Sequence, residues 1–471
     1  MNKLMVFYKI VQSKPSIIWV NNRFIEDRLS TDSFTEAYLK WKEHCSLSSN
    51  FKMIKIKDIS VSINIGFTSK RNYQNDGIKF LNISNIEPFN FNLENVKYIS
   101  KETHEDLKKS QLKSGDVLLT ITGTVGDSVV VPSNFGEANI SANIVALRLK
   151  KSFDSYYLST FFNSTYGKLQ TKGSSKSNVW SNLGVQQVRE IEIPIPSPEI
   201  QKYIGDKVRK AEELREEAKT LQKEIDILLE VDMLLKEETD KVYNIYDSKI
   251  NWTNEINIED RIDPNFYQKK YISTIEKLGN NKVRLEKYVR ITKTRYQTGN
   301  INKYIEISSI NNSFGTIDEV EELRPEEIPT SAKYQVKEGD ILVSLVRPTR
   351  KAISIVTKEY DNAICTGGFA VLQSKGKVPV EFLTAVLRTN FVGIQFERYC
   401  AGSTYPTINE DDVVKVFIPM YSENQINKIT ENYRRIIDNI YTSKKLIQEA
   451  KQDVEDLIEG NFDMSKVKAN S

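Results

Sequence analysis

The chain has 471 residues, of which 39% are apolar, and its 66 lysines and arginines nearly balance its 63 aspartates and glutamates. This length predicts two to four domains, each able to bury a core, and the composition is that of a globular protein. Three cysteines and two histidines offer neither a disulfide framework nor a histidine-rich metal site. The sequence has no apolar run long enough to cross a membrane, and we expect a cytoplasmic protein. It also has no nucleotide-binding glycine loop, and we expect that the chain is not a self-contained enzyme.

An internal repeat divides the sequence into two similar copies. The tetrad IEDR at residues 25–28 returns at 258–261, and GDVLLT at 115–120 is echoed by GDILVS at 339–344. The second pair is offset by 224 positions (339 minus 115), which is far too long for a solenoid repeat. The sequence therefore predicts a duplicated domain.

The middle of each copy is rich in β-branched apolar runs that are separated by turn residues, a pattern typical of strands. In chain order, we expect strands over residues 116–121, 128–131 and 140–149, and again over 340–346, 352–356 and 363–372. A short helix follows in each copy, near residues 156–166 and 380–391. The fold class is therefore α+β, with two pseudo-repeated mixed α/β domains.

Each copy ends in a long segment whose apolar residues alternate spacings of three and four. This heptad pattern covers residues 211–228 and 426–457 and is the seam of a coiled coil. We expect the two helices to form an antiparallel coiled coil that separates the domains; the alternative is that each helix packs only on its own domain. The expected boundaries are 1–198 (first domain), 199–241 (central helix), 242–422 (second domain), 423–460 (C-terminal helix) and 461–471 (tail).

The order of these motifs resembles the specificity subunits of Type I restriction-modification systems. The residues that carry the resemblance are EDRIDPNFY at 259–267, TGTVG at 122–126 after the Gly-Asp strand, and IPIPSPEIQ at 193–201 before the helix. The second copy departs from the pattern, because Arg347-Pro348-Thr349-Arg350 replaces the TGTVG loop. The resemblance covers nearly the whole chain, including the duplication.

The resemblance implies a sequence-specific DNA-binding subunit with two target recognition domains, each reading one half of a bipartite target in double-stranded DNA. It implies that the helices dock two methyltransferase subunits, and that restriction/translocase subunits can join the complex. Catalysis would then lie in those partners, which would bind S-adenosylmethionine, ATP and magnesium, while this chain would bind no cofactor or metal. The excess of acidic residues in 199–241 suits protein partners better than DNA phosphates.

Four loop stretches and one basic turn have the side chains that DNA reading needs. Arg71, Arg295, Arg347 and Arg350 suit guanine, Asn178, Asn182 and Gln297 suit adenine, and Lys70, Lys172 and Lys176 suit phosphate. The full set of candidate DNA-binding residues is Lys70, Arg71, Tyr73, Gln74, Thr122, Lys172, Ser174, Lys176, Ser177, Asn178, Trp180, Asn182, Lys293, Arg295, Tyr296, Gln297, Arg347, Thr349, Arg350, Arg398, Ser403, Thr404 and Tyr405. Trp180 and Tyr405 have an alternative role as core anchors.

Two other functions stay open at this point. One is a stand-alone metal-dependent nuclease or toxin that uses scattered carboxylates, since Asp116 and Asp340 recur in the two copies. Each of these aspartates directly precedes a strand in a Gly-Asp turn, where aspartate is expected for structural reasons. The other is a duplicated adaptor that binds only proteins, which a salt-dependent affinity for DNA would contradict.

Overall fold

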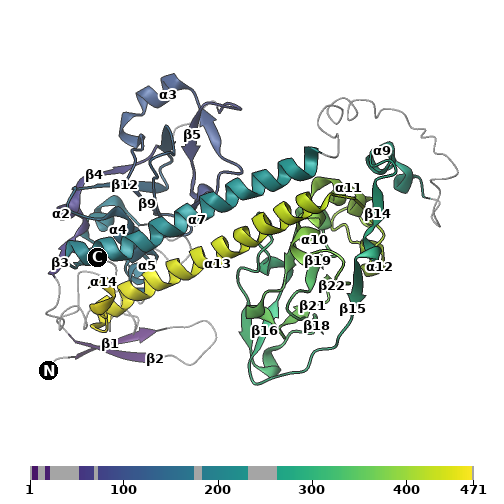
Figure 1. Cartoon of the computed structure of the whole chain (residues 1–471). Coiled ribbons are helices and arrows are strands. Elements are labelled where there is room, and N and C mark those ends of the chain that lie inside the picture. Colours follow the sequence, from purple (N-terminus) through teal and green to yellow (C-terminus); the bar gives the residue numbers. More distant parts are fainter. Residues whose placement is uncertain are drawn as a thin grey trace. The chain divides into compact units, whose positions relative to one another are not determined.

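The structure is a computed structural model that describes residues 3–8, 16–21, 52–67, 73–173, 183–231 and 263–468 (Figure 1). Contacts divide the chain into two compact units. Unit 1 comprises Met1–Glu213 and Ser443–Ser471, and unit 2 comprises Leu214–Thr442. Each long helix therefore contributes one half to each unit.

Unit 1 is built on a four-stranded antiparallel sheet and a smaller three-stranded sheet. The larger has the order β10-β9-β12-β4, and the smaller has the order β11-β5-β8 with β11 parallel to β5. The strands are β1 (Lys3–Tyr8), β2 (Ser16–Asn21), β3 (Lys52–Lys55), β4 (Ser60–Ile65), β5 (Ile78–Leu81), β6 (Ile86–Glu87), β7 (Asn90–Phe91), β8 (Lys97–Ile99), β9 (Val117–Thr120), β10 (Ser128–Val130), β11 (Ala138–Ile140), β12 (Ile144–Leu149) and β13 (Glu192–Ile195). The helices are α2 (Ile56–Ile59), α3 (Lys101–Asp106), α4 (Ser155–Asn163), α5 (Thr165–Gly173), α6 (Val185–Glu190), the first half of α7 (Pro198–Val231), the second half of α13 (Glu423–Glu459) and α14 (Ser465–Lys468).

Unit 2 repeats this plan. Its larger sheet has the order β15-β22-β19-β20, and its second sheet has the order β17-β16-β21-β18 with β16 parallel to β21. The strands are β14 (Lys282–Arg284), β15 (Val289–Thr292), β16 (Asn302–Ile305), β17 (Glu321–Leu323), β18 (Ala332–Gln335), β19 (Ile341–Ser344), β20 (Ile353–Ile355), β21 (Ile364–Thr366), β22 (Phe369–Ser374) and β23 (Phe417–Pro419). The helices are α9 (Lys269–Glu276), α10 (Val380–Leu387), α11 (Asn390–Tyr399) and α12 (Glu410–Val413), with the remaining halves of α7 and α13.

A buried glutamine clamp shows that the repeat extends to side-chain contacts. In unit 1, Gln170 donates to the carbonyl oxygen of Glu192 at 2.6 Å and accepts from its N–H at 3.3 Å. In unit 2, Gln395 makes the same two bonds to Phe417, at 2.8 and 2.7 Å. Gln170 and Gln395 lie 225 positions apart, and so do Glu192 and Phe417 (395 minus 170; 417 minus 192). The clamp therefore occupies equivalent positions in the two units.

Both long helices join the hydrophobic core of each unit. In unit 1, Ile204 and Val208 of α7 share a core cluster with Val454 of α13. In unit 2, Leu221 of α7 shares a cluster with Tyr433 of α13. In unit 2, the two helix halves, one from α7 and one from α13, run antiparallel, because the residue numbers of the contacts rise toward and along α13 as they fall along α7. The contacts there are Tyr421 with Leu229, Asn432 with Glu224, and Arg435 with Glu217.

The mixed α and β character follows the sequence expectation, but each expected third strand is in fact two strands. Residues 140–149 divide into the end of β11, which pairs with β5, and β12, which joins the larger sheet. The same break separates β21 from β22 within 363–372. Short turn segments, Ser141-Ala142-Asn143 and Gly367-Gly368, separate the two strands in each copy, so turn residues inside the predicted strand mark the change of sheet. The expected short helices are likewise each followed at once by a second helix, α5 or α11.

Candidate nucleic-acid interface

The turn between β19 and β20 of unit 2 carries cations at two unusual backbone positions. Arg347 and Lys351 have φ angles of 49° and 61°, in the left-handed region. From the pairing of the adjacent strands, their counterparts in unit 1 are Gly123 and Gly126, with φ angles of 67° and 94°. Glycine adopts this conformation at no steric cost, whereas another residue is strained by about 1 kcal/mol or more. Unit 2 therefore places an arginine and a lysine at two left-handed positions where unit 1 has glycine.

Arg347 joins this turn to a second candidate stretch, residues 398–406. Its backbone N–H donates to the carbonyl oxygen of Pro406 at 2.8 Å, and its guanidinium donates to that of Thr404 at 3.1 Å. The guanidinium carbon also lies 4.3 Å from the ring centre of Tyr405, a cation–π contact. Two stretches that are more than fifty residues apart in the sequence, both predicted to contact DNA, thus form one surface.

The outer part of this surface is open to solvent. The side chains of Thr349, Arg350, Ser403 and Thr404 are exposed, and Tyr405 is 64% exposed. The alternative role of Tyr405 as a core anchor is therefore wrong. We name Arg347, Thr349, Arg350, Thr404 and Tyr405 the basic-turn surface.

A buried arginine supports the basic turn from inside unit 2. Arg388, only 5% exposed, donates through Nη1 to the carbonyl oxygens of Lys351 at 2.8 Å and Ile353 at 3.1 Å. Its Nη2 donates to the carbonyl oxygen of Asn312 at 2.9 Å, and burial lowers the pKa of its guanidinium. Arg388 is not recognisable from the sequence as a support of the turn, because its role depends on the contact between α10 and β20.

The stretch that begins at Lys293 is fixed by ion pairs within unit 2. The ammonium of Lys293 lies 2.6 Å from Oε2 of Glu410. The other carboxylate oxygen of Glu410, Oε1, accepts a hydrogen bond of 2.9 Å from the hydroxyl of Tyr334. Arg295 forms a β-bridge with Tyr334 and has an exposed side chain. Further along, Gln297 is exposed and Tyr296 is half-buried. Arg295 and Gln297 thus stay accessible to a ligand, whereas Lys293 already has a partner.

Arg398 does not lie on this surface, which corrects its prediction as a DNA-binding residue. It belongs to α11 and is 4% exposed. Its Nε donates to the carbonyl oxygen of Phe266 at 3.0 Å, and its guanidinium carbon lies 3.8 Å from the centre of that ring. A buried and stacked guanidinium stabilises the packing of residues 264–267 on α11.

Few candidates in unit 1 fall within the described residues. Tyr73 is 44% exposed, and the ammonium of Lys97 lies 4.4 Å from its ring centre. Gln74 donates its backbone N–H to Tyr98, Thr122 is half-buried after β9, and Lys172 is exposed near the end of α5. The remaining candidates lie outside the described residues: Lys70, Arg71, Ser174, Lys176, Ser177, Asn178, Trp180 and Asn182.

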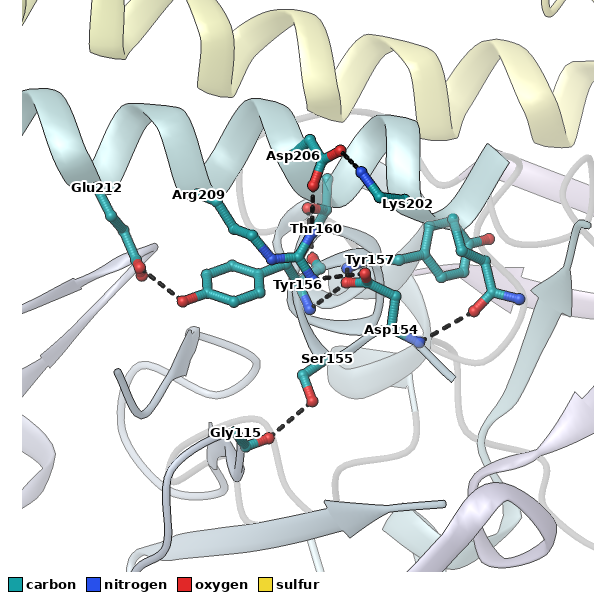
Figure 2. A network of polar contacts seen from close by, with 11 residues as sticks. Gly115, Asp154, Ser155, Tyr156, Tyr157, Thr160, Lys202, Asp206, Arg209 and Glu212 are labelled. Carbon is teal, nitrogen blue, oxygen red and sulfur yellow. Dashed lines mark hydrogen bonds and ion pairs between the residues drawn. The ribbon is translucent and has the colours of Figure 1, made fainter. Parts of the chain in front are cut away.

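A cavity of about 550 Å³ lies beside the junction of α4 and α7 in unit 1. Figure 2 shows that its charged groups face one another: Arg209 bonds Asp154 at 2.5 Å and Asp206 at 2.8 Å. The hydroxyl of Tyr156 donates to Glu212 at 2.7 Å, and burial, reinforced by this carboxylate, raises the pKa of Tyr156. Because these polar groups pair with one another, the network joins the domain to its helix.

The same junction recurs in unit 2 at the matching helix position. Arg434 bonds Glu381, in the first turn of α10, at 2.7 Å. Arg209 and Arg434 lie 225 positions apart (434 minus 209), and so do Tyr156 and Glu381 (381 minus 156). In each unit, therefore, an arginine of one long helix bonds a residue at the start of the short helix.

The recurring aspartates are structural within the described residues. Asp116 and Asp340 each accept a hydrogen bond of 2.8 Å from a backbone N–H three residues earlier, at Lys113 and Lys337. The described part of the chain holds no group of three or more His, Cys, Asp or Glu side chains that is arranged to bind a metal ion. In the same residues, no helix is both long enough and apolar enough to span a membrane.

The family comparison matches part of unit 1 and most of α7. Residues 48–226 match the family model of the Type I restriction modification DNA specificity domain. The chain is 26% identical over 152 residues to the Type I restriction enzyme EcoBI specificity subunit of Escherichia coli, which covers 32% of this chain and 31% of that protein. It is 25% identical over 151 residues to the HindI specificity subunit of Haemophilus influenzae, which covers 31% of this chain and 33% of that protein. The chain thus spans about a third of the length of these relatives.

Solved structures are similar over more of the chain at lower identity. The S subunit of a Type I restriction-modification system from M. genitalium is 13% identical, with a TM-score of 0.47, over 88% of this chain and 98% of that one. The HsdS subunit from Thermoanaerobacter tengcongensis is 15% identical, with a TM-score of 0.29, over the same shares.

Proposed function

We propose that this chain, whose residues 48–226 match the family model of the Type I restriction modification DNA specificity domain, is the sequence-specific DNA-binding subunit of a Type I restriction-modification complex. The observation that carries the proposal is the repetition of the plan of unit 1 in unit 2, from the strand order of the larger sheet to the buried clamps of Gln170 and Gln395. Two units with one plan suit a bipartite target, each unit reading one half.

The two halves of the target differ because the units present different turns. Unit 1 has Gly123 and Gly126 in the turn that follows β9, whereas unit 2 has Arg347 and Lys351 in the equivalent turn. Side chains on such turns reach base edges, while the sheets behind them hold the backbone in place. The recognition chemistry therefore varies on a repeated scaffold.

The long helices form an antiparallel coiled coil that spaces the two recognition domains. α7 has 34 residues and α13 has 37, which corresponds to about 50 Å at about 1.5 Å per residue. Ion pairs link the helices within each unit, for example Lys207 with Asp453 at 2.5 Å in unit 1. One turn of duplex DNA advances about 34 Å, so the helix length sets the unread gap between the half-sites.

Catalysis belongs to partner subunits under this proposal. The sequence has an acidic central helix, which suits the docking of two methyltransferase subunits, one per repeat, with restriction/translocase subunits completing the complex. S-adenosylmethionine, ATP and magnesium are bound by those partners. The complex acts in the cytoplasm, where its double-stranded DNA target lies.

Methylation sequencing tests the function directly. Genomic DNA from cells with and without this gene is sequenced for methylated bases, with a plasmid copy of the wild-type gene as the control for the deletion. We expect one bipartite motif to be methylated only when the chain is present. Identical methylation in both strains contradicts the proposal.

A matched insertion tests the spacer. One heptad is inserted after Glu213 in α7 and one after Thr442 in α13, at the boundary between the units. The insertion adds about 10 Å, so the methylated motif should gain about three base pairs in its gap. A heptad in α7 alone serves as the control, because it breaks the helix pairing. A functional double insertion with an unchanged gap contradicts the spacer role.

A further inference from the structure

The basic turn of unit 2 has one residue more than its counterpart in unit 1. The strand pairs that flank the turns are Leu119 with Ser128 in unit 1 and Val343 with Ile353 in unit 2. These separations are nine positions (128 minus 119) and ten positions (353 minus 343). The extra residue lies in the 3₁₀-helix η11 (Pro348–Arg350), so the tip of this turn has no equivalent in unit 1.

The two arginines of the turn differ in what their side chains already contact. The Arg347 guanidinium is half-buried, stacks on Tyr405 and donates to the carbonyl oxygen of Thr404. Arg350 is exposed, and within the described residues its guanidinium has no hydrogen-bond or ion-pair partner. Arg347 is thus committed to the protein, whereas all five donors of Arg350 are available.

Two hydrogen bonds and a buried proline fix the backbone around Arg350. Its own N–H donates to the carbonyl oxygen of Arg347 at 2.9 Å, and Pro348, the first residue of the 3₁₀-helix, is buried. Behind the turn, Arg388 holds the carbonyl oxygen of Lys351. A side chain that projects from a fixed backbone loses less conformational entropy on binding, which favours selective recognition.

Resting on the proposed function, we infer that Arg350 reads a guanine in the half-site of unit 2, and that Arg347, Tyr405 and Arg388 are positioning residues for it. The planar guanidinium can donate two parallel hydrogen bonds to O6 and N7 of guanine in the major groove, a pattern that no other base offers. The ammonium of a lysine cannot make this paired contact as a planar fork. The half-site that unit 2 reads therefore contains a G·C pair that depends on Arg350.

Selection from a pool of DNA duplexes with randomised bases tests this assignment, using the full chain in complex with its methyltransferase subunits. The wild-type complex should enrich a bipartite motif with one invariant G·C pair that becomes degenerate in Arg350→Ala. The expected loss of discrimination at that pair is about 10- to 100-fold, with the other half-site unchanged. Arg350→Lys should restore total affinity but only part of the discrimination, because an ammonium lacks the planar fork of the guanidinium. Arg324→Ala, which removes an exposed positive charge elsewhere in unit 2, is the matched control and should keep the motif.

The positioning residues have their own readout. Tyr405→Ala should weaken discrimination at the same base pair, and Tyr405→Phe should restore it because the ring under Arg347 remains. An Arg350→Ala complex that enriches the wild-type motif overturns the assignment while leaving the proposed function intact. A wild-type complex that enriches no motif contradicts the proposed function itself, and the assignment with it.

Discussion

Replacing each Gly-Asp turn aspartate by asparagine should affect the two units differently. In unit 1, Asp116 is 1% exposed and accepts two hydrogen bonds from Arg148, at 2.8 and 2.6 Å. In unit 2, Asp340 is 3% exposed and, among the described residues, accepts from the backbone of Lys337 without a hydrogen bond from any cationic side chain. The same turn therefore holds a compensated carboxylate in one unit and an uncompensated one in the other.

The magnitudes follow from these contacts. Asp116→Asn leaves the guanidinium of Arg148 without its carboxylate; breaking a fully buried pair costs about 3 to 5 kcal/mol, but Arg148 is 30% exposed and can turn toward water. We therefore expect a loss of about 2 kcal/mol in unit 1. Asp340→Asn keeps an oxygen to accept from Lys337 and removes a desolvated charge, so the stability of unit 2 should change by less than about 1 kcal/mol or rise.

The dependence on pH has a definite sign for Asp340. Burial raises the pKa of this carboxyl above its ordinary value of 3.8. Between the ordinary and the raised pKa, the folded state binds more protons than the unfolded state, so the stability of unit 2 falls as pH rises through that window. Asparagine does not titrate, and Asp340→Asn should therefore gain most relative to wild type above the raised pKa.

Hydrogen exchange of the full-length chain measures both effects, with peptides from β9 and β19 reporting unit 1 and unit 2 separately. Urea denaturation at several pH values gives the corresponding free energies. A loss in Asp340→Asn as large as that in Asp116→Asn would refute the reasoning. The metal-dependent nuclease alternative makes a different prediction, that both variants lower cleavage and magnesium affinity without this difference in stability.

Three further predictions concern helix packing, the glutamine clamp and DNA affinity. Gly205→Ala should destabilise unit 1 by about 1 to 2 kcal/mol in urea denaturation, because the new Cβ would lie 2.6 Å from a carboxylate oxygen of Asp154. Gly393→Ala is the control: its Cβ meets open space, so the variant should stabilise unit 2 by up to about 1 kcal/mol. Gln395→Ala should cost about 2 to 3 kcal/mol, measured by thermal unfolding, because it leaves the N–H and C=O of Phe417 without their partner. The affinity of the assembled complex for target DNA should fall linearly on a plot of log K against log salt in a binding titration, and a flat line would favour the protein-binding adaptor.

The repeat was the strongest signal in the sequence because it is independent of any propensity. Matching segments 224 positions apart predicted two similar mixed units, and the strand orders of both units agree with that prediction. The prediction joined residues 140–149 into one strand although Ser141-Ala142-Asn143 interrupt the apolar pattern, and the change of sheet lies at this interruption. The apolar pattern of a buried strand does not specify which neighbour that strand pairs with.

The candidate residues show a second limit of sequence reasoning. Arg398 and Arg350 both lie near glycine or proline in polar stretches, yet one guanidinium stacks inside the core and the other projects into solvent. The difference arises from Phe266, more than a hundred residues away, which covers Arg398. Arg388 was missed for the converse reason: its sequence neighbours are those of an ordinary apolar helix, and its role comes from a carbonyl oxygen of the turn on β20.

Under the proposed function, the two units suggest how a duplicated DNA-binding domain acquires two specificities. Behind the turn, Asn163 in unit 1 donates to the carbonyl oxygen of Ser128 at 2.7 Å, and Arg388, its counterpart 225 positions later (388 minus 163), donates to that of Ile353 at 3.1 Å. The longer arginine also donates to the carbonyl oxygen of Lys351, two residues before Ile353. In unit 2, the turn that is one residue longer thus occurs together with a longer buried side chain behind it, Arg388 in place of Asn163. Changing the target of such a domain requires the turn and its support to change together, because a lengthened turn without Arg388 would leave carbonyl groups unpaired inside the unit.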